Sequence, residues 1–202
     1  MTHNLRAAPI EPPERSSHLL NEHWDNSALL LFVAFNLGHI MEHVLQVVQI
    51  FLWGWPRSRA LGALGLVWPW LVRSEWLHYW YALVILVGLI VLRPILAGRA
   101  RSWWDLALGI QLWHHFEHAL LLGQVLADKN LFGATVPTSV LQLFFPRVEL
   151  HLAYNAAVLI PLGVAIYLHF HPPEGRRATE RQSLKEGGVA TMARSSPRPR
   201  PQ

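Results

Sequence analysis

The sequence predicts an all-α membrane protein whose four transmembrane helices form two tandem, duplicated helical hairpins around a pseudo-twofold axis along the membrane normal. Three observations lead to this fold class. First, 52% of the 202 residues are hydrophobic and only 15% are charged, with most charges toward the ends of the chain. Second, four apolar stretches are long enough to cross a bilayer. Third, one pattern of histidine, glutamate and arginine occurs twice.

The four apolar stretches cover residues 27–53, 75–97, 103–127 and 148–170. A helix needs about 20 residues to cross a hydrocarbon core of about 30 Å, and each stretch exceeds that length. Residues 1–26 contain prolines and mixed charge but no short apolar segment with a cleavage site. We therefore expect a cytoplasmic N-terminal tail there and no signal peptide.

Residues 172–202 are basic and rich in Pro, Gly and Ser, which predicts a disordered C-terminal tail. The tail lacks aromatic residues and a folded basic face, so we expect the lipid bilayer, and no nucleic acid, as its partner. Lys and Arg are more numerous in the two tails and the 98–102 turn than on the other side, which holds Arg57, Arg59, Arg73, Lys129 and Arg147. The positive-inside rule then predicts a multi-pass protein of the cell membrane with both termini cytoplasmic.

The two hairpins are predicted at 27–97 and 98–171, because a shift of 75 residues places HxxEH at 39–43 on HxxEH at 114–118. Further along, a shift of 73 or 74 pairs Arg73 with Arg147, Glu75 with Glu149, His78 with His151 and Tyr81 with Tyr154. Two copies of a two-span unit point the same way, so their symmetry axis runs along the membrane normal. The links 59–72 and 131–145 are apolar and interrupted by Gly and Pro, which predicts interfacial or re-entrant segments on the outer side.

The two HxxEH motifs predict a metal site inside the bundle. Positions i, i+3 and i+4 share one face of a helix, and a polar face within a membrane must point to the interior. The chain has no cysteine, so a metal must use histidine and carboxylate. The expected ligands of a dinuclear site between the first and third spans are His39, Glu42, His43, His78, His114, Glu117, His118 and His151. Whether His115 takes the place of His114 stays open.

Imidazole and carboxylate suit divalent transition metals, so we expect Fe, Zn or Cu, with two ions per chain. The leading interpretation is an integral membrane metal-binding protein, an oxidoreductase that acts on a small or lipophilic substrate. Whether an electron donor or a second copy of the chain is a partner stays open. One alternative is a cytochrome that binds haem b through two histidines. Another is a metal or proton carrier that uses the polar stripe as a path. HxxEH is also the inverted zincin pattern, but two copies on a twofold axis do not suit a peptidase with one metal and one cleft.

Overall fold

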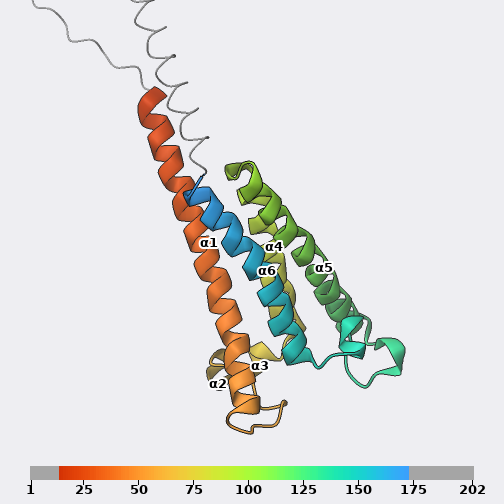
Figure 1. Cartoon of the computed structure of the whole chain (residues 1–202). Coiled ribbons are helices and arrows are strands. Elements are labelled where there is room, and N and C mark those ends of the chain that lie inside the picture. Colours follow the sequence, from red (N-terminus) through yellow and green to blue (C-terminus); the bar gives the residue numbers. More distant parts are fainter. Residues whose placement is uncertain (1–13, 173–202) are drawn as a thin grey trace, which may run out of the picture.

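The computed structural model describes residues 14–172, with side chains from Trp24 onward. Four long helices form an elongated bundle (Figure 1): α1 (Glu14–Phe51), α4 (Glu75–Leu92), α5 (Arg99–Ala127) and α6 (Arg147–Phe170). Within the described range the secondary structure is entirely helical. The predicted all-α class is therefore confirmed. The tail expected at 172–202 lies outside the described residues except for Pro172.

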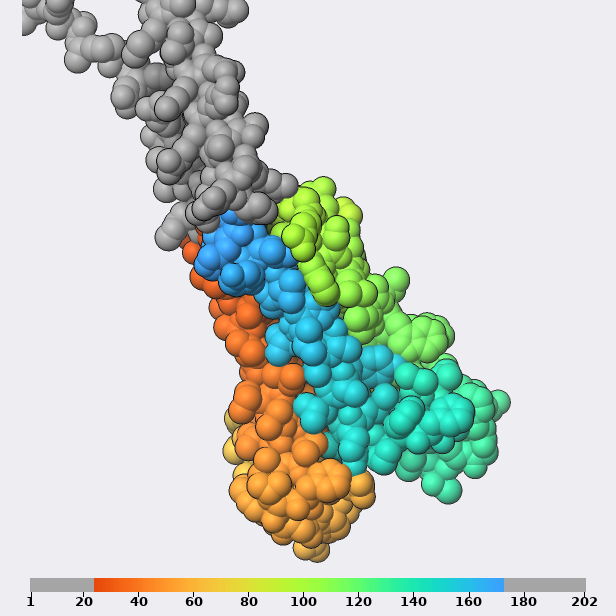
Figure 2. Space-filling view, in the orientation of Figure 1, coloured from red at the N-terminus to blue at the C-terminus, as the bar shows by residue number. Residues whose placement is uncertain are grey.

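The short elements of the two links gather at one end of the bundle, opposite the end where the described chain begins and finishes (Figure 1). The first link contains α2 (Leu64–Val67) and α3 (Pro69–Val72), and the second contains the 3₁₀ turns η2 (Leu131–Gly133) and η3 (Leu141–Leu143). The two links form separate lobes, with α6 between them (Figure 2). A third 3₁₀ turn, η1 (Arg93–Ile95), continues α4 into the turn before α5.

Three helices in the described part of the chain are long and apolar enough to cross a membrane: Trp24–Phe51, Glu75–Ile95 and Arg147–Phe170. These correspond to the first, second and fourth predicted spans. Helix α5 has 29 residues, which is sufficient length, but it is less apolar because it carries Gln111, His114, His115, Glu117 and His118. The structure thus supports a membrane protein with three candidate spans.

The distribution of side chains also fits lipid surroundings. Large apolar side chains cover much of the outside, among them Leu31, Met41, Trp80, Val91 and Phe116. Polar side chains are buried within the bundle, including Asn36, Gln46, Gln49, Gln111 and Gln124. Soluble domains rarely bury so many amides while exposing so many large apolar groups, because the apolar groups would face water.

The helix packing places α4 and α6 between α1 and α5 (Figure 1). In the half of the bundle away from the links, the core is apolar and centres on Trp104, whose indole Nε1 donates to the carbonyl of Leu89 at 2.7 Å. On the other half, the interior is polar. Gln111 marks the transition, donating through Nε2 to the carbonyl of Ala82 on α4 at 2.9 Å. The polar half contains the histidines.

Candidate metal site

Two histidine pairs face the interior from α1 and α5. His39 and His43 lie one turn apart on α1, with their Nε2 atoms 3.3 Å apart. His114 and His118 have the same spacing on α5, with their Nε2 atoms 3.2 Å apart. His43, His114 and His118 are buried, while His39 is half-buried. Each HxxEH motif therefore presents two ring nitrogens at one place, as the helical spacing predicts.

His78 of α4 and His151 of α6 point into the bundle from the first turn of their helices. In both residues Nδ1 faces the backbone carbonyl four residues earlier, that of Ser74 at 2.9 Å and that of Arg147 at 2.7 Å. A carbonyl only accepts hydrogen bonds, so each Nδ1 carries the hydrogen and each Nε2 keeps its lone pair. Metal-binding histidines in proteins commonly have this arrangement. The Nε2 of His151 is buried without a hydrogen-bond partner.

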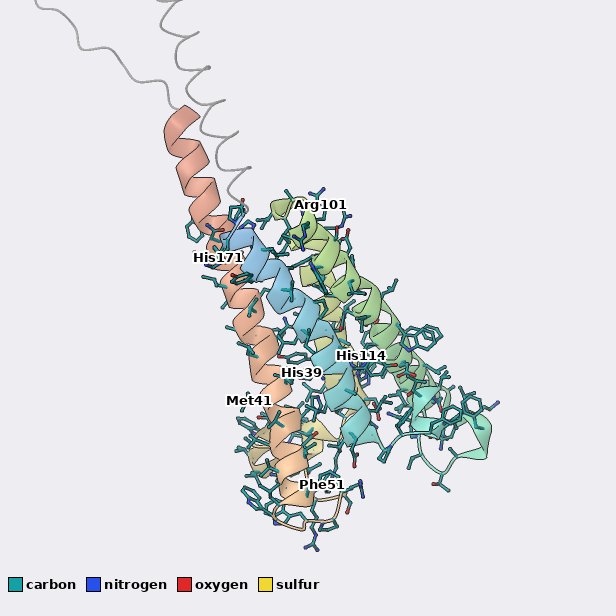
Figure 3. All side chains as sticks on the ribbon, in the orientation of Figure 1. His39, Met41, Phe51, Arg101, His114 and His171 are labelled. Carbon is teal, nitrogen blue, oxygen red and sulfur yellow. The ribbon has the colours of Figure 1, made fainter. Side chains whose placement is uncertain are left out.

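The six rings form one connected cluster. His151 is central: its ring centroid lies 5.5 Å from that of His43, 5.6 Å from His114 and 5.0 Å from His118. The ring of His78 is 5.9 Å from those of both His118 and His151. Figure 3 shows His39 and His114 at the same level of the bundle, from α1 and α5. The structure thus brings together all six histidines that the sequence analysis selected.

His115 lies beside this cluster. Its ring contacts Tyr79 of α4 with centroids 5.1 Å apart, and it is half-buried. His114, in contrast, is buried and contacts both His118 and His151. The structure therefore places His114 in the cluster and His115 next to α4.

The two glutamates face the outer links. Both carboxylate oxygens of Glu42 lie near the backbone N–H of Leu64, at 3.2 and 3.1 Å. The Oε1 of Glu117 accepts from the backbone N–H of Leu141 at 2.9 Å. Glu42 also lines a small cavity of about 140 Å³ together with His39, His43 and His78. Each carboxylate therefore lies at the edge of the cluster and is bound to the link of its own hairpin.

Two tyrosines complete the cluster, and the sequence analysis gave them no role. Tyr81 stacks on His39 with centroids 3.9 Å apart, and Tyr154 packs on His114 at 4.4 Å. The Tyr81 hydroxyl donates to the carbonyl of Phe35 at 2.9 Å, and the Tyr154 oxygen accepts from the indole of Trp113 at 2.7 Å. Tyr81 follows His78 by three residues, and Tyr154 follows His151 by three residues. This shared spacing is the sequence signal that could have identified the two tyrosines.

Two glutamines hold the links, a role that the sequence alone did not predict for either of them. Gln49 pairs with both backbone groups of Gly62, accepting from its N–H at 2.9 Å and donating to its carbonyl at 3.2 Å. Gln124 does the same with Thr138, at 3.2 and 3.0 Å. These amides fix the links over the histidine cluster.

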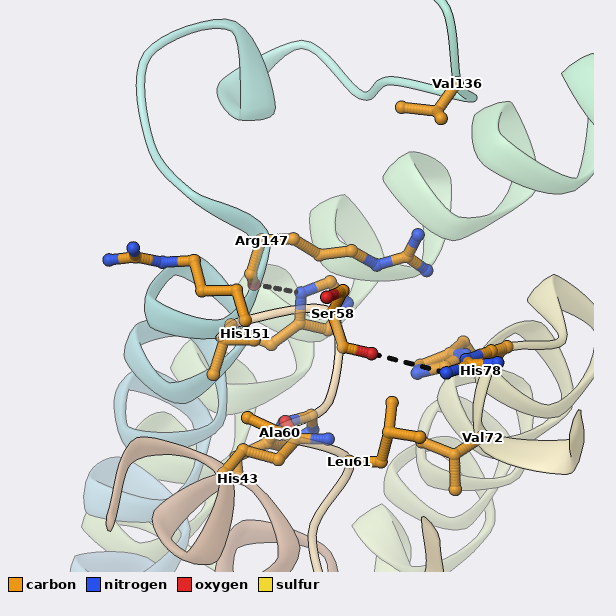
Figure 4. A pocket seen from close by; sticks show the side chains of 13 residues that line it. His43, Ser58, Ala60, Leu61, Val72, His78, Val136, Arg147 and His151 are labelled. Carbon is orange, nitrogen blue, oxygen red and sulfur yellow. Dashed lines mark hydrogen bonds between the residues drawn. The ribbon is translucent and has the colours of Figure 1, made fainter. Parts of the chain in front are cut away.

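A cavity of about 510 Å³ lies between the links and the cluster (Figure 4). Three arginines line it, Arg57, Arg73 and Arg147, together with three of the clustered histidines, His43, His78 and His151. The dashed line from His151 to Arg147 in Figure 4 is the carbonyl bond described above. The cavity thus connects the region of the arginines to the buried rings.

Comparison with known proteins found no match. No protein-family model matches the chain, and neither the curated proteins nor the solved structures that were compared contain a significant match. The interpretation of the site therefore rests on its chemistry.

The geometry of the histidine pairs fits metal coordination. Two imidazole nitrogens at about 2.0–2.1 Å from one tetrahedral metal lie about 3.3 Å from each other. The Nε2 separations of 3.3 and 3.2 Å agree with that value. Between Trp24 and Pro172, however, no group of three or more His, Asp or Glu side chains is arranged to hold an ion as the side chains stand. In each pair one Nε2 donates its hydrogen to the other. For a pair and a further histidine to bind one ion, the ring of that histidine would have to turn toward the pair.

Proposed function

We propose that the chain is an integral membrane metal-binding protein with a dinuclear histidine site, and that it is an oxidoreductase. The observation that carries this proposal is the meeting of two Nε2 pairs with two further histidines whose Nδ1 atoms are bound to backbone carbonyls. Four helices supply imidazoles to one buried region. Purely structural hydrogen bonding gives no reason to leave the Nε2 of His151 unpartnered.

The donor set suits two ions. Each pair supplies two nitrogens from one helix, and His78 and His151 supply two more. Glu42 and Glu117 lie at the edge of the cluster and are close enough in sequence to the pairs to complete either ion's ligands. Nitrogen-rich sites of this kind suit Fe, Cu or Zn, of which Fe and Cu support redox chemistry. Tyr81 is stacked on His39 and Tyr154 packs at a tilt on His114, and these ring contacts support an electron-transfer role.

A duplicated hairpin around a pseudo-twofold axis is part of the proposal. Equivalent contacts in the two halves support it. Glu42 and Glu117 each bind an N–H of their own link, and Gln49 and Gln124 each bind one link residue. In each half a tyrosine ring also packs against the first histidine of the motif. Such agreement in contacts is harder to produce by chance than agreement in composition.

We further propose that α5 is a fourth span and that both termini are cytoplasmic. Helix α5 packs along both α4 and α6, which cover its polar face. The residues that lower its apolar content are largely buried, among them Gln111, His114, Glu117 and His118. A helix whose polar side is covered by neighbours can cross a bilayer at lower average hydropathy than an isolated one.

Close packing of the rings argues against haem b. The His151 ring contacts His43 on one side and His114 and His118 on the other, so a porphyrin between the two pairs must displace it. The alternative, a metal or proton carrier, uses the same histidine cluster. Such a protein would move ions through the cluster without converting a substrate.

Metal analysis of the purified full-length protein, with an absorption spectrum, tests the proposal. We expect about two non-haem transition-metal ions per chain and no Soret band. Replacement of His151 by Ala should reduce the bound metal, with monodispersity on gel filtration showing that the variant folds. His171→Ala is the matched control, because His171 also binds the carbonyl four residues earlier, that of Tyr167, but at the far end of α6. A Soret band would favour the cytochrome, and a parent protein without either cofactor would exclude both.

A further inference from the structure

The charges around the 510 Å³ cavity are unevenly paired. Arg147 binds both carboxylate oxygens of Glu75, at 2.5 and 2.6 Å, and Arg57 binds Glu149 at 2.6 Å. Arg73 makes one long contact, 3.4 Å, to the carbonyl of Ser58, and it has no carboxylate partner in the described part of the chain. No acidic residue lines the cavity. One guanidinium charge at the cavity is thus left without a counter-charge.

The start of α6 lies at the same cavity, and the acidic residue in its first turn, Glu149, is bound by Arg57. Arg147 and Val148 are the first two residues of this 24-residue helix and both line the cavity. The residue before them, Pro146, provides no side-chain cap. The first N–H groups of a helix lack intrahelical acceptors and attract anions. Arg73 and the α6 terminus therefore favour the same kind of ligand.

The inner end of the cavity has the opposite chemistry. The Nε2 of His151 is buried, unpartnered and carries a lone pair, and His43 and His78 line the same end. Lone pairs attract a cation, while the Arg73 guanidinium, which lines the same cavity, attracts an anion. The cavity is therefore polarised, with an anion site next to a cation site.

We propose that this cavity is an outer vestibule that binds a small oxyanion, such as a short carboxylate, between Arg73 and the histidine cluster. This names the substrate class of the proposed metal site as small and anionic. The volume holds such an ion together with several waters, each of which occupies about 30 Å³. The evidence for the anion site is Arg73, the α6 terminus and the cavity. Only the passage of the anion from that site to the histidine cluster rests on the proposed function.

Protection of arginines from phenylglyoxal tests the vestibule. The full-length protein in lipid nanodiscs is labelled in the presence of formate or of its neutral analogue formamide, at constant ionic strength, and modified arginines are located by peptide mass spectrometry. Formate should protect Arg73 in a saturable way, and formamide should not. Arg59 is the internal control, because it is exposed on the same link but does not line the cavity. Equal protection of Arg59 and Arg73, or no protection of either, overturns the proposal.

Variants separate the vestibule from the metal site. In protein that holds metal, the formate concentration that perturbs the metal spectrum should rise about tenfold in Arg73→Gln and stay unchanged in Arg59→Gln, because only Arg73 borders the ligand. If the protein holds metal, but formate neither protects Arg73 nor changes the metal spectrum, the vestibule is contradicted and the metal site is not. If the protein holds no metal, but formate still protects Arg73, the metal site is contradicted and the vestibule is not.

Discussion

At the scale of single residues, the question is what compensates the negative charges of Glu42 and Glu117. Glu117 is 3% exposed, and the acceptor role of its Oε1 toward Leu141 N–H does not neutralise a charge. A buried carboxylate without a compensating cation or proton costs several kcal/mol. A nearby metal would compensate both glutamates, and this is the physical reason to expect them in the site.

Replacement of Glu42 or Glu117 by Gln therefore distinguishes a metal ligand from a structural acceptor. The amide oxygen of Gln still accepts the N–H of the link, so the fold is retained, but the negative charge is lost. We expect each variant to retain metal about 10- to 100-fold less tightly, and the double variant to lose less than the sum. Bound metal after dialysis is the measurement. Glu149→Gln removes the same charge from the Arg57 pair and should leave metal binding unchanged. Full occupancy in Glu42→Gln and Glu117→Gln would show that neither carboxylate serves the metal.

The two histidine pairs could be selected from the sequence because helical periodicity places i and i+4 on one face whatever the surroundings are. His78 and His151 could be selected because the internal repeat pairs them. The backbone N–H donors that bind Glu42 and Glu117 could not be predicted, because they depend on the path of the outer links. The same holds for the clamp made by Gln49 on Gly62. Contacts within one helix follow from spacing, and contacts between a helix and an irregular segment do not.

At the scale of elements, the contact between α1 and α4 depends on Gly88. A Cβ atom on Gly88 would overlap the ring of Phe32, which is buried and packs against Trp104 with centroids 5.8 Å apart. Small residues allow such close helix contacts in membranes.

Gly88→Ala should therefore destabilise the protein by about 1–3 kcal/mol through overpacking. Gly109→Ala is the matched control, since nothing lies within 4 Å of a Cβ placed there. The control should be neutral or stabilise by up to about 1 kcal/mol, because Ala favours helix more than Gly. Denaturation in mixed micelles measures both. Equal stability of the two variants would mean that Phe32 can move aside.

Helix limits show what the apolar pattern can and cannot predict. The four stretches agree with α1, α4, α5 and α6, but α1 begins at Glu14, well before residue 27. That part carries polar residues, so no apolar run indicates it. Helix α4 ends at Leu92, earlier than the predicted 97, because Pro94 disfavours helix at the residue before it.

At the scale of the whole molecule, topology depends on α5. If α5 crosses the bilayer, the 98–102 turn and the 128–140 link lie on opposite sides. Reporter domains fused after Arg101 and after Lys129 should then give opposite signals, with the first cytoplasmic, as the positive-inside rule predicts. A fusion after Arg73 is the control and should agree with the one after Lys129. A cytoplasmic signal from the fusion after Lys129 contradicts both the fourth span and the orientation.

The ion pairs bear on whether the two hairpins can move against each other. Arg57–Glu149 and Arg147–Glu75 join one hairpin to the other on the side of the links. On the opposite side the chain itself joins them, and Arg93 binds Asp105 across that turn at 2.6 and 2.8 Å. The hairpins are fastened at both ends, so rocking of one against the other must break contacts at whichever end opens. Alternating access of the kind used by transporters is thus opposed by the architecture. For the proposed metal site, this arrangement would leave the side of the links as the route by which ligands enter and leave.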